Sequence, residues 1–175
     1  MSLEDILALS EEEFNRIYLE RLYKLRQDIK NIKARLKKKN KTLSANQELI
    51  CSMISTSKNS AIIHVNNVRI QFSTGCKKHG LKHILLRHFC EECEGKISAM
   101  DIISLERFLL QNNAFKERDN KYGYIYQKDA VNKYKLILFK DVNAEGVLSV
   151  YKMDRVENED GANSPQAKAS ETSKG

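Results

Sequence analysis

The feature that most constrains the fold is a set of short segments in which apolar and polar residues alternate. The stretch AIIHVNNVRIQF alternates on both sides of Asn66 and Asn67. Because asparagine tolerates the positive φ of a two-residue hairpin turn, this stretch predicts a β-hairpin. Three later segments, KYGYIYQK, KYKLILFK and GVLSVYKM, are rich in β-branched and aromatic residues and are separated by turn-like residues. They predict an antiparallel meander of three strands.

Two segments carry the spacing and the capping residues of helices. Over residues 10–39 the apolar residues are spaced alternately four and three apart, which predicts one long amphipathic helix with a narrow apolar stripe. Ser10 and Glu13 match a capping box at its start. The segment SAMDIISLERFLLQNN begins with a similar pair, Ser98 and Asp101, and predicts a second helix.

These segments together predict an α+β fold: a long N-terminal helix, then helices packed on an antiparallel sheet of four to five strands that ends in the three-strand meander. By composition the chain divides into an N-terminal amphipathic helix over residues 1–44, a globular domain over residues 45–155 and a tail over residues 156–175. We expect the tail to be disordered, because it is polar and lacks aromatic residues.

The expected compartment is the cytoplasm. No stretch approaches the about 18 consecutive apolar residues of a membrane span, and the first residues lack the basic and apolar regions of a secretory signal. A membrane is therefore not an expected partner. In a reducing compartment the four cysteines are expected to be free thiols or metal ligands rather than a disulfide framework.

The charge of the chain suits a polyanionic partner. The net charge is +7, and residues 61–155 hold sixteen basic against eleven acidic side chains. A surplus of this size is compatible with binding a nucleic acid, although many soluble proteins are equally basic.

The segment GLKHILLRH, residues 80–88, combines a helical apolar face with groups that bind phosphate and transfer protons. His83 and Arg87 are one helical turn apart, with β-carbons about 6 Å from each other, so both can contact one phosphate. They are predicted to point away from the apolar face, which consists of Leu81, Ile84, Leu85 and His88. Histidine moves a proton near neutral pH and arginine grips a phosphate with two donors, so the pair suits phosphodiester cleavage. His88 is either a core histidine or a second functional group.

This segment, the helix after it and the meander ending in VLSVYK resemble the phage-associated branch of the barnase, EndoU, colicin and RelE-like (BECR) ribonuclease superfamily. The resemblance covers roughly residues 60–155. In that family a Gly-x-Lys-His-Ile-x-x-Arg-His helix supplies a catalytic histidine, and a late strand often adds a serine or threonine. The resemblance implies catalytic roles for the matching residues Lys82, His83, Arg87 and His88, and a weaker one for Ser149.

The resemblance also implies an activity. It predicts a metal-independent endoribonuclease, toxin-like or phage-associated, which needs no cofactor and cleaves RNA by 2′-hydroxyl attack to leave 2′,3′-cyclic phosphate ends. RNA is then the expected partner, together with an immunity or antitoxin protein. Because His83 and His88 face different sides of an ideal helix, they are not expected to contact one phosphate together.

The predicted meander carries residues suited to binding a substrate. Tyr124 belongs to a stripe of alternate tyrosines on which bases can stack, although packing between strands explains such a stripe equally well. Lys133 and Lys135 alternate with apolar residues and are candidates for contacting the RNA backbone. Tyr151 shares a face of the last strand with Ser149.

An alternative interpretation starts from the cysteines. Cys76 and His79 form one closely spaced pair, and Cys90 and Cys93 form another, on either side of the 80–88 segment. Two such pairs suit a closed tetrahedral zinc site. The chain would then be a zinc-stapled nucleic-acid-binding module without catalysis.

A third interpretation starts from the long N-terminal helix. Its apolar stripe suits a coiled coil, so the chain would be a non-enzymatic docking protein that forms a homodimer through this helix. The same stripe can equally pack on the chain's own domain.

Overall fold

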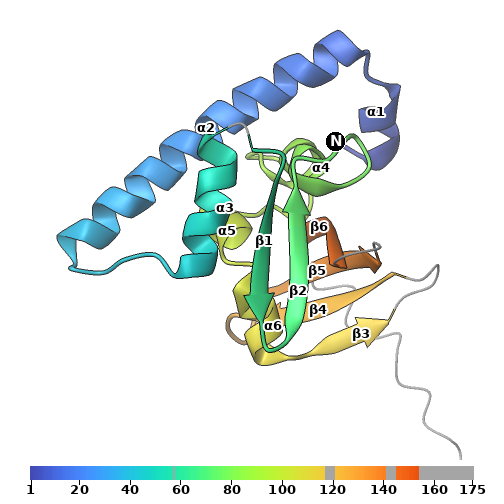
Figure 1. The fold of residues 1–175 in the computed structure, drawn as a ribbon. Helices are drawn as coiled ribbons and strands as arrows, with labels where there is room; N and C mark the ends of the chain where they lie inside the picture. The colour runs from blue at the N-terminus through green and yellow to red at the C-terminus, as the bar shows by residue number, and fades with distance from the viewer. Residues whose placement is uncertain (57, 117–120, 141–144, 154–175) are drawn as a thin grey trace, which may run out of the picture.

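The structure of the protein is a computed structural model that describes residues 1–56, 58–116, 121–140 and 145–153. These residues form an α+β fold with a six-stranded mixed sheet (Figure 1). The helices are α1 (Leu3–Ala8), α2 (Glu11–Lys38), α3 (Ala45–Ser55), α4 (Gly80–His88), α5 (Ala99–Ile103) and α6 (Glu106–Gln111). The strands are β1 (Ser60–Val65), β2 (Val68–Ser73), β3 (Ala114–Lys116), β4 (Tyr122–Gln127), β5 (Lys133–Lys140) and β6 (Glu145–Lys152). Their order in the sheet is β1-β2-β6-β5-β4-β3.

The predicted hairpin and meander are both confirmed. Strands β1 and β2 pair antiparallel around Asn66 and Asn67, which have φ angles of 49° and 65°. Strands β4, β5 and β6 form the antiparallel meander. The predicted strand number is too low and the predicted sheet type is wrong, for two reasons. The short β3 adds a strand beside β4, and β2 pairs with β6 in parallel, because the chain passes through helices and three strands before it returns.

Both predicted helices exist, but the second is divided. Helix α2 begins at the predicted capping box of Ser10 and Glu13. The segment that starts with the capping box of Ser98 and Asp101 forms α5 and α6 rather than one helix. The break falls at Ser104, whose hydroxyl accepts a hydrogen bond from the Gln47 side chain at 2.9 Å.

The apolar stripe of α2 belongs to the chain's own core. Its buried residues Leu22, Leu25, Ile29 and Ile32 share one cluster with buried residues of α3, α5 and the sheet. Each fully buried side chain of this kind contributes about 1.5–3 kcal/mol through the hydrophobic effect. The stripe is therefore accounted for without a second chain, and the predicted N-terminal helix and globular domain share a core. The predicted tail, residues 156–175, lies outside the described residues.

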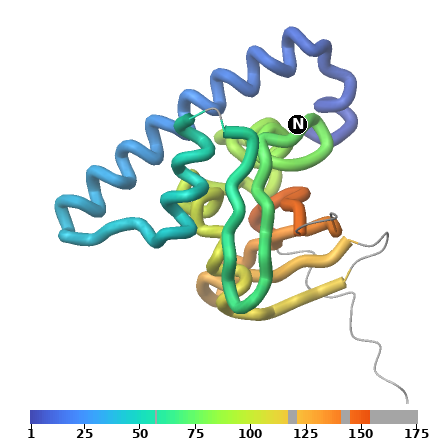
Figure 2. The backbone as a smooth tube through the Cα atoms, in the orientation of Figure 1, coloured from blue at the N-terminus to red at the C-terminus, as the bar shows by residue number. Residues whose placement is uncertain are grey.

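Helix α4 lies between the N-terminal helices and the sheet. It contacts α2 on one side and β6 and β2 on the other, and α1 folds back to contact it as well (Figure 2). The remaining helices α3, α5 and α6 pack against other parts of the sheet and of α2. Within the described ranges, no helix combines the length and the apolar character that crossing a membrane requires.

Candidate active site

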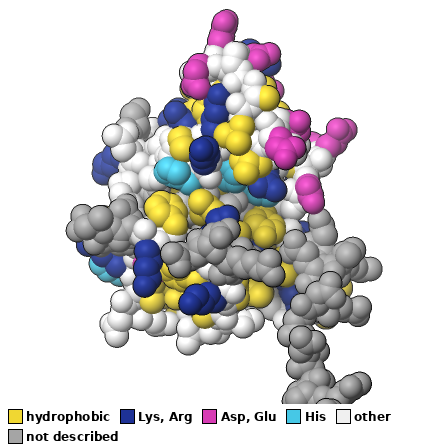
Figure 3. Space-filling view, turned by 90° about the vertical axis from the view of Figure 1, so that its right-hand side faces the viewer, with side chains coloured by type: hydrophobic (Ala, Val, Ile, Leu, Met, Phe, Trp, Pro, Cys, Tyr) yellow, Lys and Arg dark blue, Asp and Glu magenta, His cyan; other side chains and the backbone are white. Residues whose placement is uncertain are grey.

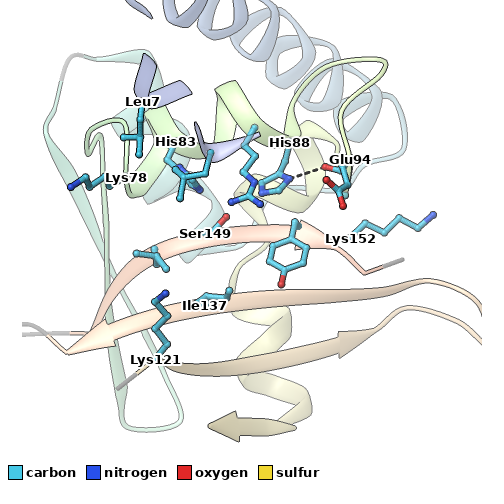
Figure 4. A pocket seen from close by; sticks show the side chains of 14 residues that line it. Leu7, Lys78, His83, His88, Glu94, Lys121, Ile137, Ser149 and Lys152 are labelled. Atoms are coloured by element: carbon cyan, nitrogen blue, oxygen red, sulfur yellow. Dashed lines mark hydrogen bonds between the residues drawn. The ribbon is translucent and has the colours of Figure 1, made fainter. Parts of the chain in front are cut away.

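Helix α4 and strand β6 enclose a pocket of about 400 Å³ (Figure 4). Its lining includes His83, Arg87 and His88 from α4, and Ser149 and Tyr151 from β6. Small-ligand sites typically measure about 300–1,000 Å³, so the pocket is large enough for part of a nucleotide chain. All five residues are among those that the sequence predicts as functional. The fold thus brings the helix motif and the last strand to one place.

His83 is held by the loop that precedes α4. Its side chain is 3% exposed, and its Nδ1 lies 2.9 Å from the carbonyl oxygen of Lys77. The loop enters the helix at Gly80, where φ is +77° and a Cβ would lie 2.7 Å from the carbonyl oxygen of Ser73. Because a carbonyl oxygen only accepts, Nδ1 donates, and Nε2 of the neutral ring keeps its lone pair. The prediction that His83 points away from the buried side of the helix is wrong, because this loop and β6 cover it.

His88 is held in the same way by the loop that follows α4. Its side chain is 4% exposed, and its Nδ1 donates to the carbonyl oxygen of Glu94 at 2.9 Å, the dashed line in Figure 4. The ring stacks on Tyr151, with centroids 5.2 Å apart and planes 23° apart. At Gly95, where φ is +61°, a Cβ would lie 3.3 Å from Nδ1 of His88. His88 is therefore buried, as a core histidine would be, and it also lines the pocket.

The two imidazole rings converge, contrary to the prediction. Their centroids are 6.3 Å apart and their planes meet at 78°. Residues five apart on an ideal helix point about 140° apart, which is why His83 and His88 are expected to diverge. They converge because a carbonyl group from each flanking loop turns one ring towards β6. Both rings therefore line the same pocket.

Burial lowers the pKa of both histidines. For His88 the pKa falls from 6.5 to about 4, because burial disfavours the charged ring more than the hydrogen bond to Glu94 favours it. For His83 burial is again the main cause of the lowered pKa, and the hydrogen bond to Lys77 opposes it. The positive charge of Arg87 lowers the pKa of both rings further. Both rings are therefore neutral at pH 7 in the unliganded protein.

The charges around the pocket suit an anion. Three lysines, Lys78, Lys121 and Lys152, line it together with Arg87, whereas Glu94 is the acidic side chain among its described lining residues. Figure 3 shows histidine side chains on this face among apolar and basic ones, with acidic side chains gathered at the end formed by α1 and the start of α2. A negatively charged ligand would thus meet a net positive wall.

The hydroxyl of Ser149 belongs to the same pocket as the two histidines. Ser149 is 4% exposed, and its Oγ has no hydrogen-bond partner among the described residues. In Figure 4 this hydroxyl points from β6 towards the two histidines. A buried polar atom without a partner costs about 1–3 kcal/mol, so a bound polar group is its natural partner.

The remaining candidates lie outside the pocket lining. Lys82 faces α2, with its Nζ 5.9 Å from the ring centroid of Phe14 and 5.3 Å from that of Tyr18. Its position thus does not support the catalytic role that the resemblance implies.

The predicted substrate-binding residues of the sheet are divided between its two faces. Tyr124 is partly buried and packs against the core. This position agrees with packing between strands, the alternative explanation of the tyrosine stripe. Lys133 and Lys135 share a face of β5 with Ile137, which lines the pocket. The ammonium of Lys135 lies 4.8 Å from the ring centroid of Phe115.

Sequence reasoning missed the part of the pocket wall that α1 forms. Leu3 and Leu7 line the pocket, while Ile6 is fully buried against α2 and α4. Lys77 contacts the segment that connects α1 to α2. Its ammonium donates a hydrogen bond to the carbonyl oxygen of Leu9 at 2.7 Å and forms an ion pair with Glu11 at 3.0 Å. The capping box of Ser2 and Asp5 is the sequence signal that predicts α1.

The four predicted zinc ligands are not gathered at one point. Cys90 and Cys93 form a disulfide, Cys76 is exposed, and the ring of His79 packs on Phe139 at a centroid distance of 5.5 Å. In the part of the chain that the structure describes, no cluster of three or more His, Cys, Asp or Glu side chains is arranged to hold a metal ion. The expectation that all four cysteines are reduced or metal-bound is wrong for the Cys90–Cys93 pair, because the turn after α4 brings these two together.

Comparison with known proteins adds no family to this description. A scan against protein-family models finds no match, and searches of curated proteins and of solved structures find no significant match either. Function therefore rests on the geometry of the pocket.

Proposed function

We propose that the chain is a metal-independent endoribonuclease that cleaves RNA by attack of a 2′-hydroxyl on the adjacent phosphodiester. One observation carries the proposal. Two buried imidazoles, His83 and His88, each use Nδ1 on a loop carbonyl and share one pocket with the Arg87 guanidinium and the unpaired Ser149 hydroxyl. This cleavage needs a base, an acid and cationic support for the phosphorane, and the pocket holds candidates for all three.

His88 is the proposed general base. Its lowered pKa, about 4, keeps the ring neutral above that pH, so Nε2 carries a lone pair. The negative charge of a bound phosphate would strengthen this weak base by raising its pKa. Its Nε2 takes the proton from the 2′-hydroxyl as the 2′-oxygen forms its bond to phosphorus. The bond from phosphorus to the 5′-oxygen then breaks, which leaves a 2′,3′-cyclic phosphate on one product.

His83 is the proposed general acid. A phosphate bound between the rings favours the imidazolium form, so substrate binding offsets the effect of burial on the pKa of His83. The protonated Nε2 then donates to the leaving 5′-oxygen. The proton taken up by His88 and the proton lost by His83 balance over one cycle once they are exchanged with solvent.

Arg87 and Ser149 are the proposed phosphate-binding groups. The guanidinium is one helical turn from His83 and offers two parallel donors to the non-bridging phosphate oxygens. The Ser149 hydroxyl faces the same space and gains the partner that it lacks in the unliganded protein. Lys78, Lys121 and Lys152 extend the positive wall along which the RNA backbone would lie.

The resemblance of GLKHILLRH and the meander to the BECR superfamily supports the same activity. It also supports a toxin-like or phage-associated role in the cytoplasm, with an immunity or antitoxin protein as a partner.

The test is cleavage of a labelled RNA by the purified chain in EDTA, with matched histidine variants. His83→Asn and His88→Asn each keep an amide N–H near the position of Nδ1 but lack Nε2, and each should lower the rate by about 10²–10⁴-fold. His64→Asn changes an exposed histidine of β1 and should cleave at the wild-type rate. A folded wild-type chain without cleavage, or a His83→Asn chain at the wild-type rate, would refute the proposal.

A further inference from the structure

The loop between α4 and α5 is tied to His88 by two hydrogen bonds and is closed on itself by a disulfide. The carbonyl oxygen of Glu94 accepts from Nδ1 of His88, and the carbonyl oxygen of His88 accepts from the Ile97 amide at 3.0 Å. Between these contacts the disulfide joins Cys90 to Cys93, with Cα atoms 5.2 Å apart. Cys93 directly precedes Glu94, so the disulfide constrains the residue next to the one that holds the imidazole.

Arg21 of α2 connects this disulfide to the end of α4. Its Nη1 donates to the carbonyl oxygens of Leu85 and Leu86 at 2.7 and 2.5 Å, which are among the last carbonyls of the helix. The same nitrogen lies 3.8 Å from Sγ of Cys93. A guanidinium beside a sulfur stabilises the thiolate that is released when a disulfide opens.

We propose that Cys90 and Cys93 form a thiol–disulfide exchange site whose redox state sets the position of the His88 ring. The reactant is a thiol or dithiol. Its thiolate attacks Sγ of Cys90, which is partly exposed, whereas Cys93 is buried. Cys93 leaves as a thiolate beside Arg21, and a second thiol of the reactant then releases Cys90. Two electrons and two protons pass to the pair, and the reactant leaves as its own disulfide.

Opening the disulfide loosens the loop because its other side-chain tethers are weak. Glu91 pairs with Lys24 and Lys96, but all three side chains are about half or more exposed, and water and salt screen such pairs. Without the cross-link, the Glu94 carbonyl is positioned against Nδ1 of His88 by backbone hydrogen bonds, from the Lys152 amide to the Gly95 carbonyl and from the Ile97 amide to the His88 carbonyl. We expect its position relative to the ring to change. The effect on cleavage rests on the proposed function, whereas the effect on the histidine ring does not.

The first measurement counts thiols in the folded chain. A Cys51→Ala/Cys76→Ser background removes both free cysteines, so the expected result is no alkylation by iodoacetamide before treatment with dithiothreitol and two labels after it. Removal of the reductant should restore the unlabelled state. Two labels without reductant, or about one zinc per chain with no disulfide, would overturn the proposal.

The second measurement follows the imidazole protons by NMR. The Nδ1–H signal of His88, assigned by its absence in His88→Asn, should shift or broaden on reduction and return on reoxidation. The Nδ1–H of His83 bonds to Lys77 in the loop before α4, so it should stay protected from exchange with water and shift less than that of His88, through the ring current of the neighbouring imidazole alone. A Cys90→Ser/Cys93→Ser chain should match the reduced protein and be insensitive to dithiothreitol. An unchanged His88 signal would overturn the proposal.

RNA cleavage provides the third measurement and separates the two proposals. Reduction should lower kcat/KM roughly 10–100-fold, because small displacements of a reacting group are costly. A His88 signal that responds in a chain without ribonuclease activity would refute the proposed function and leave the exchange site standing. Equal cleavage in both redox states, together with an unchanged His88 signal, would refute the exchange site and leave the proposed function standing.

Discussion

Acid should destabilise the protein through His88, and a single substitution should remove that part of the effect. The folded-state pKa of His88 is about 4 and its ordinary value is 6.5, so the unfolded chain binds more protons between these values. The stability that this group contributes is fully present above pH 6.5 and is lost as the pH falls towards 4. At 1.36 kcal/mol per pKa unit, the loss is about 2 kcal/mol by pH 5 and about 3 kcal/mol once the pH passes below 4.

The assay is urea unfolding of the wild type and of His88→Asn at pH values from 7.5 to 5. Carboxylates titrate in both proteins and cancel in the difference. The stability advantage of the wild type should therefore shrink by about 2 kcal/mol between pH 7.5 and pH 5. The exposed His64→Asn variant should follow the wild type throughout. A wild-type advantage that stays constant over this range would refute the inference that a buried, neutral His88 opposes protonation.

Two further predictions concern the core and the phosphate site. Leu25→Ala, at a fully buried position of α2, should lower the free energy of unfolding by about 2–5 kcal/mol, whereas Leu19→Ala, at a position 60% exposed on the same helix, should change it by less than about 0.5 kcal/mol. Urea titrations measure both, and equal effects would show that the stripe is not core. Arg87→Lys should reduce RNA cleavage with little change in melting temperature, because one ammonium cannot replace a two-pronged guanidinium. Full activity of this variant would exclude a bidentate role.

Capping residues, turn residues and apolar spacing predicted the hairpin and the long helix, because both depend on residues that are close together in the sequence. The hairpin follows from Asn66 and Asn67, and α2 follows from its capping box and apolar period. Strand β3 has three residues, too few to show an alternating pattern of apolar and polar residues. The parallel pairing of β2 with β6 involves two residue pairs that are far apart in the sequence, so no local signal predicts it. Helix α3 was not predicted, although its capping box of Ser44 and Gln47 is a local signal for the start of a helix.

The candidate site shows the same division. The motif pointed to His83, Arg87 and His88, and all three line the pocket. Helical geometry alone placed the two histidines apart, because their convergence depends on carbonyl groups from flanking loops and on Tyr151, which lies more than sixty residues further along the chain. Lys82 faces aromatic rings of α2 instead, a contact between distant segments that a nine-residue motif does not contain.

The central claim is that the attacking group belongs to the RNA, and one substitution in the substrate tests it most directly. An oligoribonucleotide with a single cleaved linkage is compared, in EDTA, with the same molecule bearing a 2′-deoxy sugar immediately 5′ of that linkage, and the products are identified by mass spectrometry. We expect cleavage of the first to a 2′,3′-cyclic phosphate and a 5′-hydroxyl, and no cleavage of the second at that linkage. Cleavage of the deoxy-substituted linkage, or products with a 5′-phosphate, would refute the proposed mechanism, because both require a nucleophile other than the 2′-hydroxyl.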